Sequence, residues 1–116
     1  MRLATGDVVW HEAPFKRPQP DGSRPDRPWL IISNDNHPFQ GTEYIVVGMT
    51  TNPRAEGLRV QQADWRNGGT STTSYISPWF AMTLKHADIS YRIGTLQDSL
   101  VNNAVDELAA RLGPDP

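Results

Sequence analysis

The sequence predicts a small, mainly-β domain: a barrel or curled sheet closed by one C-terminal helix. Three observations indicate this fold class: several short β-branched and aromatic segments, glycine- and proline-rich turns between them, and one segment with helical periodicity near the end. The chain has 116 residues, enough for one hydrophobic core but not for two typical domains of ~100–150 residues. We therefore predict a single domain over residues 1–116, with the barrel over about 5–96 and the helix over about 98–112.

The first half of the chain predicts three strands. Residues 7–10 form a short β-branched and aromatic run. Residues 29–32 and 44–49 are apolar throughout, which is typical of strands buried on both faces. Residues 13–26 contain four prolines and predict a long loop, and residues 33–38 are rich in turn-forming side chains.

The second half predicts shorter extended segments. Residues 58–61 alternate between apolar and polar side chains, and residues 75–76 resume strand character after the Asn-Gly-Gly sequence at 67–69. This arrangement predicts a hairpin whose turn uses the glycines. Further extended pieces are expected at residues 80–84 and around Ile89 and Ile93, which makes five to seven strands in all.

Residues 98–112 predict the only helix. Their apolar side chains recur at steps of three and four, namely at Val101, Ala104, Val105, Leu108 and Leu112. Asp98 stands where a carboxylate complements the helix dipole, and Gly113 followed by proline ends the pattern.

Composition excludes several classes of function. The chain has no cysteine, so disulfides, thiolate nucleophiles and cysteine-bound zinc are excluded. A net charge of −2 argues against a broad basic surface for duplex nucleic acid. Neither a signal segment nor a membrane-spanning run is present, so we expect a cytoplasmic protein without membrane contact.

Neither a metal nor a cofactor is expected. His11, His37 and His86 lie far apart without metal-ligand spacing, and glycine-rich phosphate motifs are absent. The remaining Arg, Thr, Ser, Asn, His and carboxylate side chains are adequate for metal-free RNA cleavage, because the substrate's own 2′-hydroxyl is the nucleophile. Such a site needs a base, an acid and a cation that stabilises the charged phosphorane.

Three segments resemble the N-terminal signatures of the MazF/PemK toxin family in order and spacing. They are residues 6–10, 26–35 and 45–51, and residues 92–96 with the terminal helix resemble the family's closing segment. The resemblance implies an SH3-like barrel of the CcdB/MazF-like plasmid maintenance toxin fold. It also implies a homodimer that cuts single-stranded RNA sequence-selectively without metal, as the toxin of a toxin-antitoxin system restrained by a cognate antitoxin.

The resemblance places the catalytic residues at Arg27 and Thr50. Arg27 matches the arginine that begins the family's second strand, and Thr50 matches the threonine that ends the third. A guanidinium and a hydroxyl could together hold the scissile phosphate. The alternative is that Arg27 pairs with Asp26 or Asp7 and that Thr50 is an ordinary strand-end residue.

The long loop coincides with the family's mobile loop over the RNA groove. With the signature segments, it supplies the residues expected to contact RNA: His11, Glu12, Lys16, Arg17, Arg24, Asn34 and Thr51. His11 could act as base or acid because imidazole titrates near neutrality, and Glu12 is the alternative carboxylate. The loop charges could equally be solvated without a specific role. Stacking on RNA bases is assigned to none of the four tryptophans.

The match weakens at residues 75–80. Some family members use an arginine and an aspartate here as acid and base, and this chain has neither, which leaves the proton donor and acceptor open. Pro78 is also expected to interrupt strand pairing. Two alternatives follow: a non-catalytic RNA- or protein-binding barrel, and a topoisomerase (gyrase) inhibitor on the same fold. The second expects an aromatic residue at the helix end, where residues 112–114 offer none.

Overall fold

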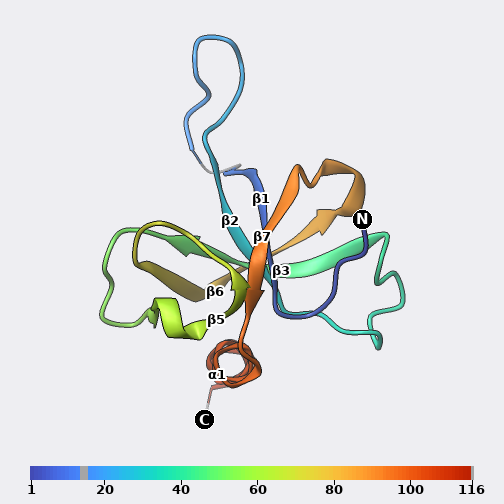
Figure 1. Cartoon of the computed structure of the whole chain (residues 1–116). Helices are drawn as coiled ribbons and strands as arrows, with labels where there is room; N and C mark the ends of the chain where they lie inside the picture. Colours follow the sequence, from blue (N-terminus) through green and yellow to red (C-terminus); the bar gives the residue numbers. More distant parts are fainter. Residues whose placement is uncertain (14–15, 116) are drawn as a thin grey trace.

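The computed structural model describes residues 1–13 and 16–115, so Pro14 and Phe15 of the predicted loop and the terminal Pro116 lie outside the described part. Within it, seven strands, two 3-10 helices and one α-helix follow one another (Figure 1). They are β1 (Asp7–Glu12), β2 (Asp26–Ile31), β3 (Glu43–Thr50), β4 (Leu58–Val60), η1 (Gln62–Asp64), β5 (Trp65–Gly68), β6 (Ser74–Lys85), η2 (His86–Asp88), β7 (Tyr91–Leu96) and α1 (Asp98–Ala109).

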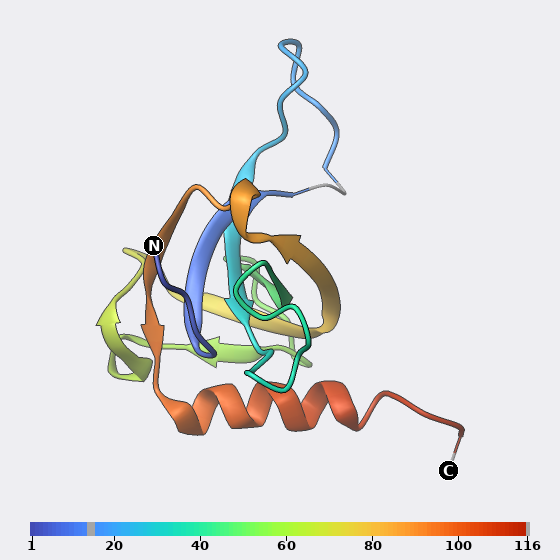
Figure 2. The ribbon, with the colours of Figure 1, turned by 90° about the vertical axis from the view of Figure 1, so that its right-hand side faces the viewer.

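The seven strands form one antiparallel sheet that curls into a near-closed barrel. Their order is β4-β6-β3-β2-β1-β7-β5. Figure 2 shows α1 lying across one side of this barrel. The predicted mainly-β barrel with a terminal helix is therefore confirmed.

Two apolar clusters form the core, and the central strands contribute to both. In β1, Val8 belongs to the cluster that includes α1 and Val9 belongs to the other. Leu30 and Ile31 of β2 divide in the same way, because consecutive side chains of a strand point to opposite faces. The prediction of burial on both faces, made for residues 29–32 and 44–49, is confirmed for most of both segments, but it is wrong for Ile45, which is 38% exposed.

The predicted hairpin is right in its pairing and wrong in its connection. Leu58 pairs with Ile76, so β4 and β6 are neighbours. The chain between them forms η1 and then β5, which pairs with β7 rather than turning back. Gly68, at φ +65°, belongs to that second pairing, and a Cβ there would collide with the carbonyl oxygen of Ile93.

Two segment boundaries also differ from the prediction. Residues 75–76 and 80–84 belong to one twelve-residue strand, β6, rather than to two pieces. The helix ends at Ala109, three residues before Leu112, and continues as a turn. No helix in the described part of the chain combines the length and apolar character needed to cross a membrane.

Candidate functional site

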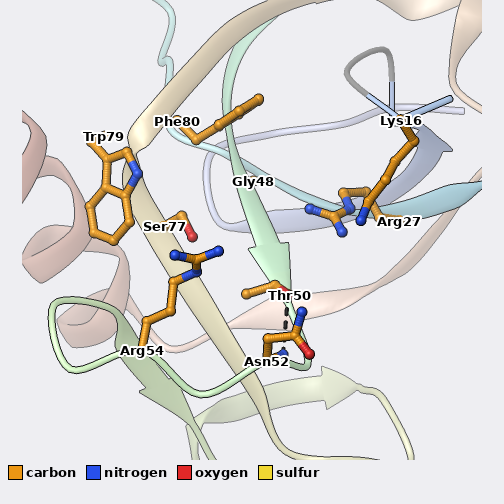
Figure 3. A pocket seen from close by; sticks show the side chains of 9 residues that line it. All are labelled: Lys16, Arg27, Gly48, Thr50, Asn52, Arg54, Ser77, Trp79 and Phe80. Carbon is orange, nitrogen blue, oxygen red and sulfur yellow. Dashed lines mark hydrogen bonds between the residues drawn. The ribbon is translucent and has the colours of Figure 1, made fainter.

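A cavity of about 270 Å³ lies where β2 begins and β3 ends. It is called the cationic pocket below, and its lining residues are Lys16, Arg27, Gly48, Thr50, Asn52, Arg54, Ser77, Trp79 and Phe80. Figure 3 shows Arg27 and Lys16 reaching in from one side and Arg54 from the other. The antiparallel sheet produces this arrangement, because it places the start of β2 beside the end of β3.

Three positively charged side chains face this small volume, and its lining, as far as the chain is described, includes no carboxylate. Arg27 is half-buried at the start of β2, while Arg54 comes from the loop between β3 and β4. Burial lowers the pKa of Arg27 below its ordinary value, and the nearby Arg54 charge lowers it further. A bound anion would relieve this like-charge repulsion, so the pocket is suited to a phosphate or carboxylate.

A bulge in β6 builds one wall of the cationic pocket. Val47 pairs with Ala81 whereas the next residue, Gly48, pairs with Ser77, so three residues of β6 have no counterpart on β3. The first of them is Pro78, which lacks the N–H that a regular ladder requires, so the expected interruption of pairing is confirmed. The bulge brings Trp79 to the pocket, and the guanidinium of Arg111 lies 5.7 Å from its ring centroid.

Thr50 provides a hydroxyl group between the arginines. Its Oγ1 accepts a hydrogen bond from the backbone N–H of Asn52 at 3.1 Å, which fixes the side chain at the strand end (Figure 3). The hydroxyl proton can still donate to an acceptor in the pocket. Arg27, Thr50 and Lys16 are therefore the three predicted site residues that the fold brings together.

The other two predicted cations of the long loop lie outside the cationic pocket. Arg17 is exposed, and the Nε of Arg24 donates to the carbonyl oxygen of Lys16 at 3.0 Å. Arg24 therefore shapes the backbone at Lys16.

His11 and Glu12 line a separate cavity with Asp26, Asp88 and Ser90. The Nδ1 of His11 lies 3.0 Å from the carbonyl oxygen of Asp88. Neither side chain lines the cationic pocket, and no three His, Cys, Asp or Glu side chains gather as a metal site among residues 1–13 and 16–115. Asp7, one suggested partner of Arg27, accepts hydrogen bonds from the Ala4 N–H and from Thr95.

Asn34 and Thr51 occupy two further places. Asn34 lies in the connection between β2 and β3, at the opposite strand ends from Arg27 and Thr50, and its Oδ1 accepts from the N–H of Asn36. Thr51 lines a second cavity, which Thr50 does not line. The predicted RNA-contacting residues are thus spread over several surfaces.

Arg54 is the cation of the pocket that the sequence did not predict. It lies in the exposed turn that follows β3, and only its position shortly after Thr50 could have drawn attention to it. In the sequence, residues 75–80 stand out only because they lack the arginine and aspartate that some family members have there, and nothing in the sequence indicates that they form a pocket wall.

Comparison with known proteins places the chain in one family. A model described as "PemK-like, MazF-like toxin of type II toxin-antitoxin system" matches residues 4–112. A mycobacterial endoribonuclease, solved with its cognate antitoxin, is similar over 98% of this chain and 99% of its own, with 23% identity and a TM-score of 0.65. MazF from Deinococcus radiodurans is similar over 98% of this chain and 99% of its own, with 12% identity and a TM-score of 0.69. The Mycobacterium tuberculosis toxin MazF-mt6 is similar over 89% of this chain and 93% of its own, with 25% identity and a TM-score of 0.59. A comparison with curated proteins finds no significant match.

Proposed function

This chain belongs to the PemK-like, MazF-like toxin family of type II toxin-antitoxin systems, and we propose that it is a metal-independent, sequence-selective endoribonuclease that cleaves single-stranded RNA. The observation that carries the proposal is that Arg27 and Thr50 meet in one pocket with two further cations. A relative solved as an endoribonuclease with its antitoxin supports the same reaction class.

The cationic pocket matches the charge change of RNA cleavage. The 2′-oxygen of the substrate attacks the adjacent phosphorus, the O2′–P bond forms and the P–O5′ bond breaks. The products are a 2′,3′-cyclic phosphate and a 5′-hydroxyl end. The pentacoordinate phosphorane carries one more negative charge than the ground state, so guanidinium groups on both sides stabilise it more than they stabilise the substrate. Arg27 and Arg54 are placed for that role, and Thr50 donates to a non-bridging oxygen.

Two proton transfers complete the reaction: one proton leaves O2′ and another reaches O5′. His11, considered as base or acid, and Glu12, the alternative carboxylate, line a separate cavity, so they would act only on an RNA that spans both cavities. Thr50, Asn52 and Ser77 supply the uncharged polar side chains of the cationic pocket.

The proposal includes two protein partners. A cationic pocket that accepts phosphate also accepts the carboxylates of a protein inhibitor, so we expect a cognate antitoxin to cover it. A homodimer, in which two copies flank one RNA strand, and a cytoplasmic location complete the proposal.

Incubation of the purified protein with mixed-sequence single-stranded RNA in EDTA tests the reaction. We expect discrete fragments with 2′,3′-cyclic phosphate ends. Arg27→Ala should lower the rate by about 10²–10³-fold, the usual loss when one preorganised donor to a developing oxyanion is removed. Arg59→Ala removes an exposed arginine that does not line the cationic pocket and serves as the matched control.

The outcome also separates the alternatives. Intact RNA after incubation with the unmodified protein would overturn the proposal. RNA that is bound but not cut, with binding that survives Arg27→Ala, would indicate the non-catalytic binding barrel instead.

A further inference from the structure

A second cavity, of about 420 Å³, lies at the same end of β2 as the cationic pocket. It is called the Trp10–Tyr91 pocket here. Its lining includes Pro28 and Thr51, which directly follow Arg27 and Thr50 of the cationic pocket in the chain. Because consecutive side chains of a strand point to opposite sides, Arg27 and Pro28 reach the two pockets from opposite sides of the same end of β2, and Thr51 lies directly beyond the end of β3. A polymer that crosses these strand ends would reach both pockets.

The floor of the Trp10–Tyr91 pocket is aromatic. Trp10 of β1 and Tyr91 of β7 are cross-strand partners, and their ring centroids lie 6.3 Å apart with planes inclined by 25°. Tyr91 is 53% exposed. The two rings are nearly parallel and Tyr91 is open to solvent, so an unpaired nucleobase can stack on its exposed face.

The opposite wall is polar and comes from the connection between β5 and β6. This connection contributes the hydroxyl groups of Thr70, Ser71 and Thr72, and the first residue of β6 contributes that of Ser74, which is 2% exposed. Thr70 Oγ1 donates to the carbonyl oxygen of Thr72 at 2.8 Å, which holds the segment in place. Thr70 Oγ1 can still accept, and a hydroxyl group otherwise both donates and accepts, so this wall can pair with the polar edge of a base.

Arg92 adds a positive charge to the lining of the same pocket. The side chain of Arg92 is 47% exposed, and its Nη1 lies 3.9 Å from Asp7 Oδ1, beyond ordinary hydrogen-bond length. Its guanidinium can therefore turn towards a phosphate beside the pocket.

We propose that the Trp10–Tyr91 pocket binds one nucleobase of the RNA whose scissile phosphate lies in the cationic pocket, and that it sets base preference at that position. The identity of the polymer rests on the proposed function. A nucleotide has a group that matches each of these features. Its planar base can stack on the aromatic side chains, the polar edge of the base can form hydrogen bonds with the hydroxyl groups, and its phosphate can bind Arg92. Of the four tryptophans, none of which the sequence assigned to stacking, Trp10 thus becomes the stacking residue.

Trp10 and Trp79 report on the two pockets separately, since each lines one of them. The indole N–H signals of ¹⁵N-labelled protein are followed by NMR while each of the four nucleoside 5′-monophosphates is added, with ribose 5-phosphate as the base-free probe. We expect the monophosphates to shift the Trp10 signal and ribose 5-phosphate to shift only that of Trp79. The signal of Trp29, which is fully buried, is the reference for global change.

Two results would overturn the proposal. One is a Trp10 signal that stays still with all four monophosphates or moves equally with ribose 5-phosphate. The other is a Trp10 signal that changes with protein concentration and not with nucleotide, which would make the pocket a contact between two copies of the chain.

A cleavage experiment separates the base subsite from the proposed activity. Fragment ends from a random-sequence RNA pool are sequenced for Tyr91→Ala and for the control Phe39→Ala, which removes an aromatic ring that is 60% exposed and lines neither pocket. We expect Tyr91→Ala to weaken the preference at one base position by about tenfold, from lost stacking, and Phe39→Ala to preserve it. An unchanged motif in Tyr91→Ala overturns the subsite alone. Nucleotide-dependent Trp10 shifts without RNA cleavage by the unmodified protein overturn the proposed function alone.

Discussion

The two ends of the β2–β3 strand pair differ in the polar and charged side chains that they bring together. At the end where β2 leads into β3, Ser33 is 8% exposed, donates its hydroxyl hydrogen to Gln40 Oε1 at 2.7 Å, and accepts from the N–H of Ile45 at 2.9 Å. Glu43 beside it pairs with Lys85 at 2.9 Å. Donors meet acceptors and positive charges meet negative ones here.

At the other end, like charges are gathered instead. Arg27, Arg54 and Lys16 line one small cavity around Thr50. These side chains repel one another, and the Arg54 charge adds to burial in lowering the pKa of Arg27. We propose that one end of the strand pair closes the fold, while the other is suited to an anionic ligand.

The sharpest test of this contrast is Arg54→Ala. If Arg54 serves the phosphate, we expect kcat/KM for RNA cleavage to fall by about 10–100-fold, the loss expected for one charge-assisted hydrogen bond. The melting temperature should stay level or rise, because a repulsive charge is removed.

The two readouts decide between a role in function and a role in stability. A fall in melting temperature that parallels the loss of activity would make Arg54 a structural residue. Arg59→Ala is again the matched control and should leave both quantities unchanged, because this exposed side chain lies outside the pocket.

The end of the strand pair where β2 leads into β3 could be predicted from the sequence better than the end that carries the cationic pocket. The apolar runs at 29–32 and 44–49 and the turn signals at 33–38 are local patterns, and the structure confirms strands and a turn there with shifts of a few residues. The pairing of β5 with β7 was missed, because it joins segments far apart in the chain and only the glycines at 68 and 94 allow their close approach.

The site residues could be predicted only in the segments that resemble the MazF/PemK family. Arg27 and Thr50 lie in signature segments, and the structure places both in the cationic pocket. Arg54 gave no signal, since a single arginine in a turn resembles any solvated charge. The role of residues 78–80 depended on a bulge whose effect on register cannot be read from the sequence.

The next largest effect is expected at the closing end, from Ser33→Ala. The substitution leaves the N–H of Ile45 without its side-chain acceptor and Gln40 Oε1 without its donor, and both hydrogen bonds are part-buried. A typical intramolecular hydrogen bond contributes about 0.5–1.5 kcal/mol, so the free energy of unfolding measured with urea should fall by about 1–3 kcal/mol for the two bonds together. RNA cleavage well below the melting temperature should be unchanged.

Asn34→Ala is the neighbouring control. Asn34 is exposed, and its loss removes only the hydrogen bond to the Asn36 N–H, so its effect on unfolding should be smaller. If Ser33→Ala instead lowers cleavage without affecting stability, the hypothesis that this strand end serves folding and the other end serves activity is wrong.

The smallest effect concerns the ion pair at the closing end and depends on pH. The hydrogen bond from Lys85 is the main cause that holds the pKa of Glu43 below its ordinary value of 4.5. A carboxyl group whose pKa is lower in the folded than in the unfolded chain stabilises the fold above its unfolded value and loses that contribution as pH falls through the folded value. The melting temperature of Glu43→Gln should therefore lie below that of the unmodified protein at neutral pH, and the two curves should converge below 4.5. A gap that persists in acid would mean that the glutamine disturbs packing and that the charge pair contributes nothing.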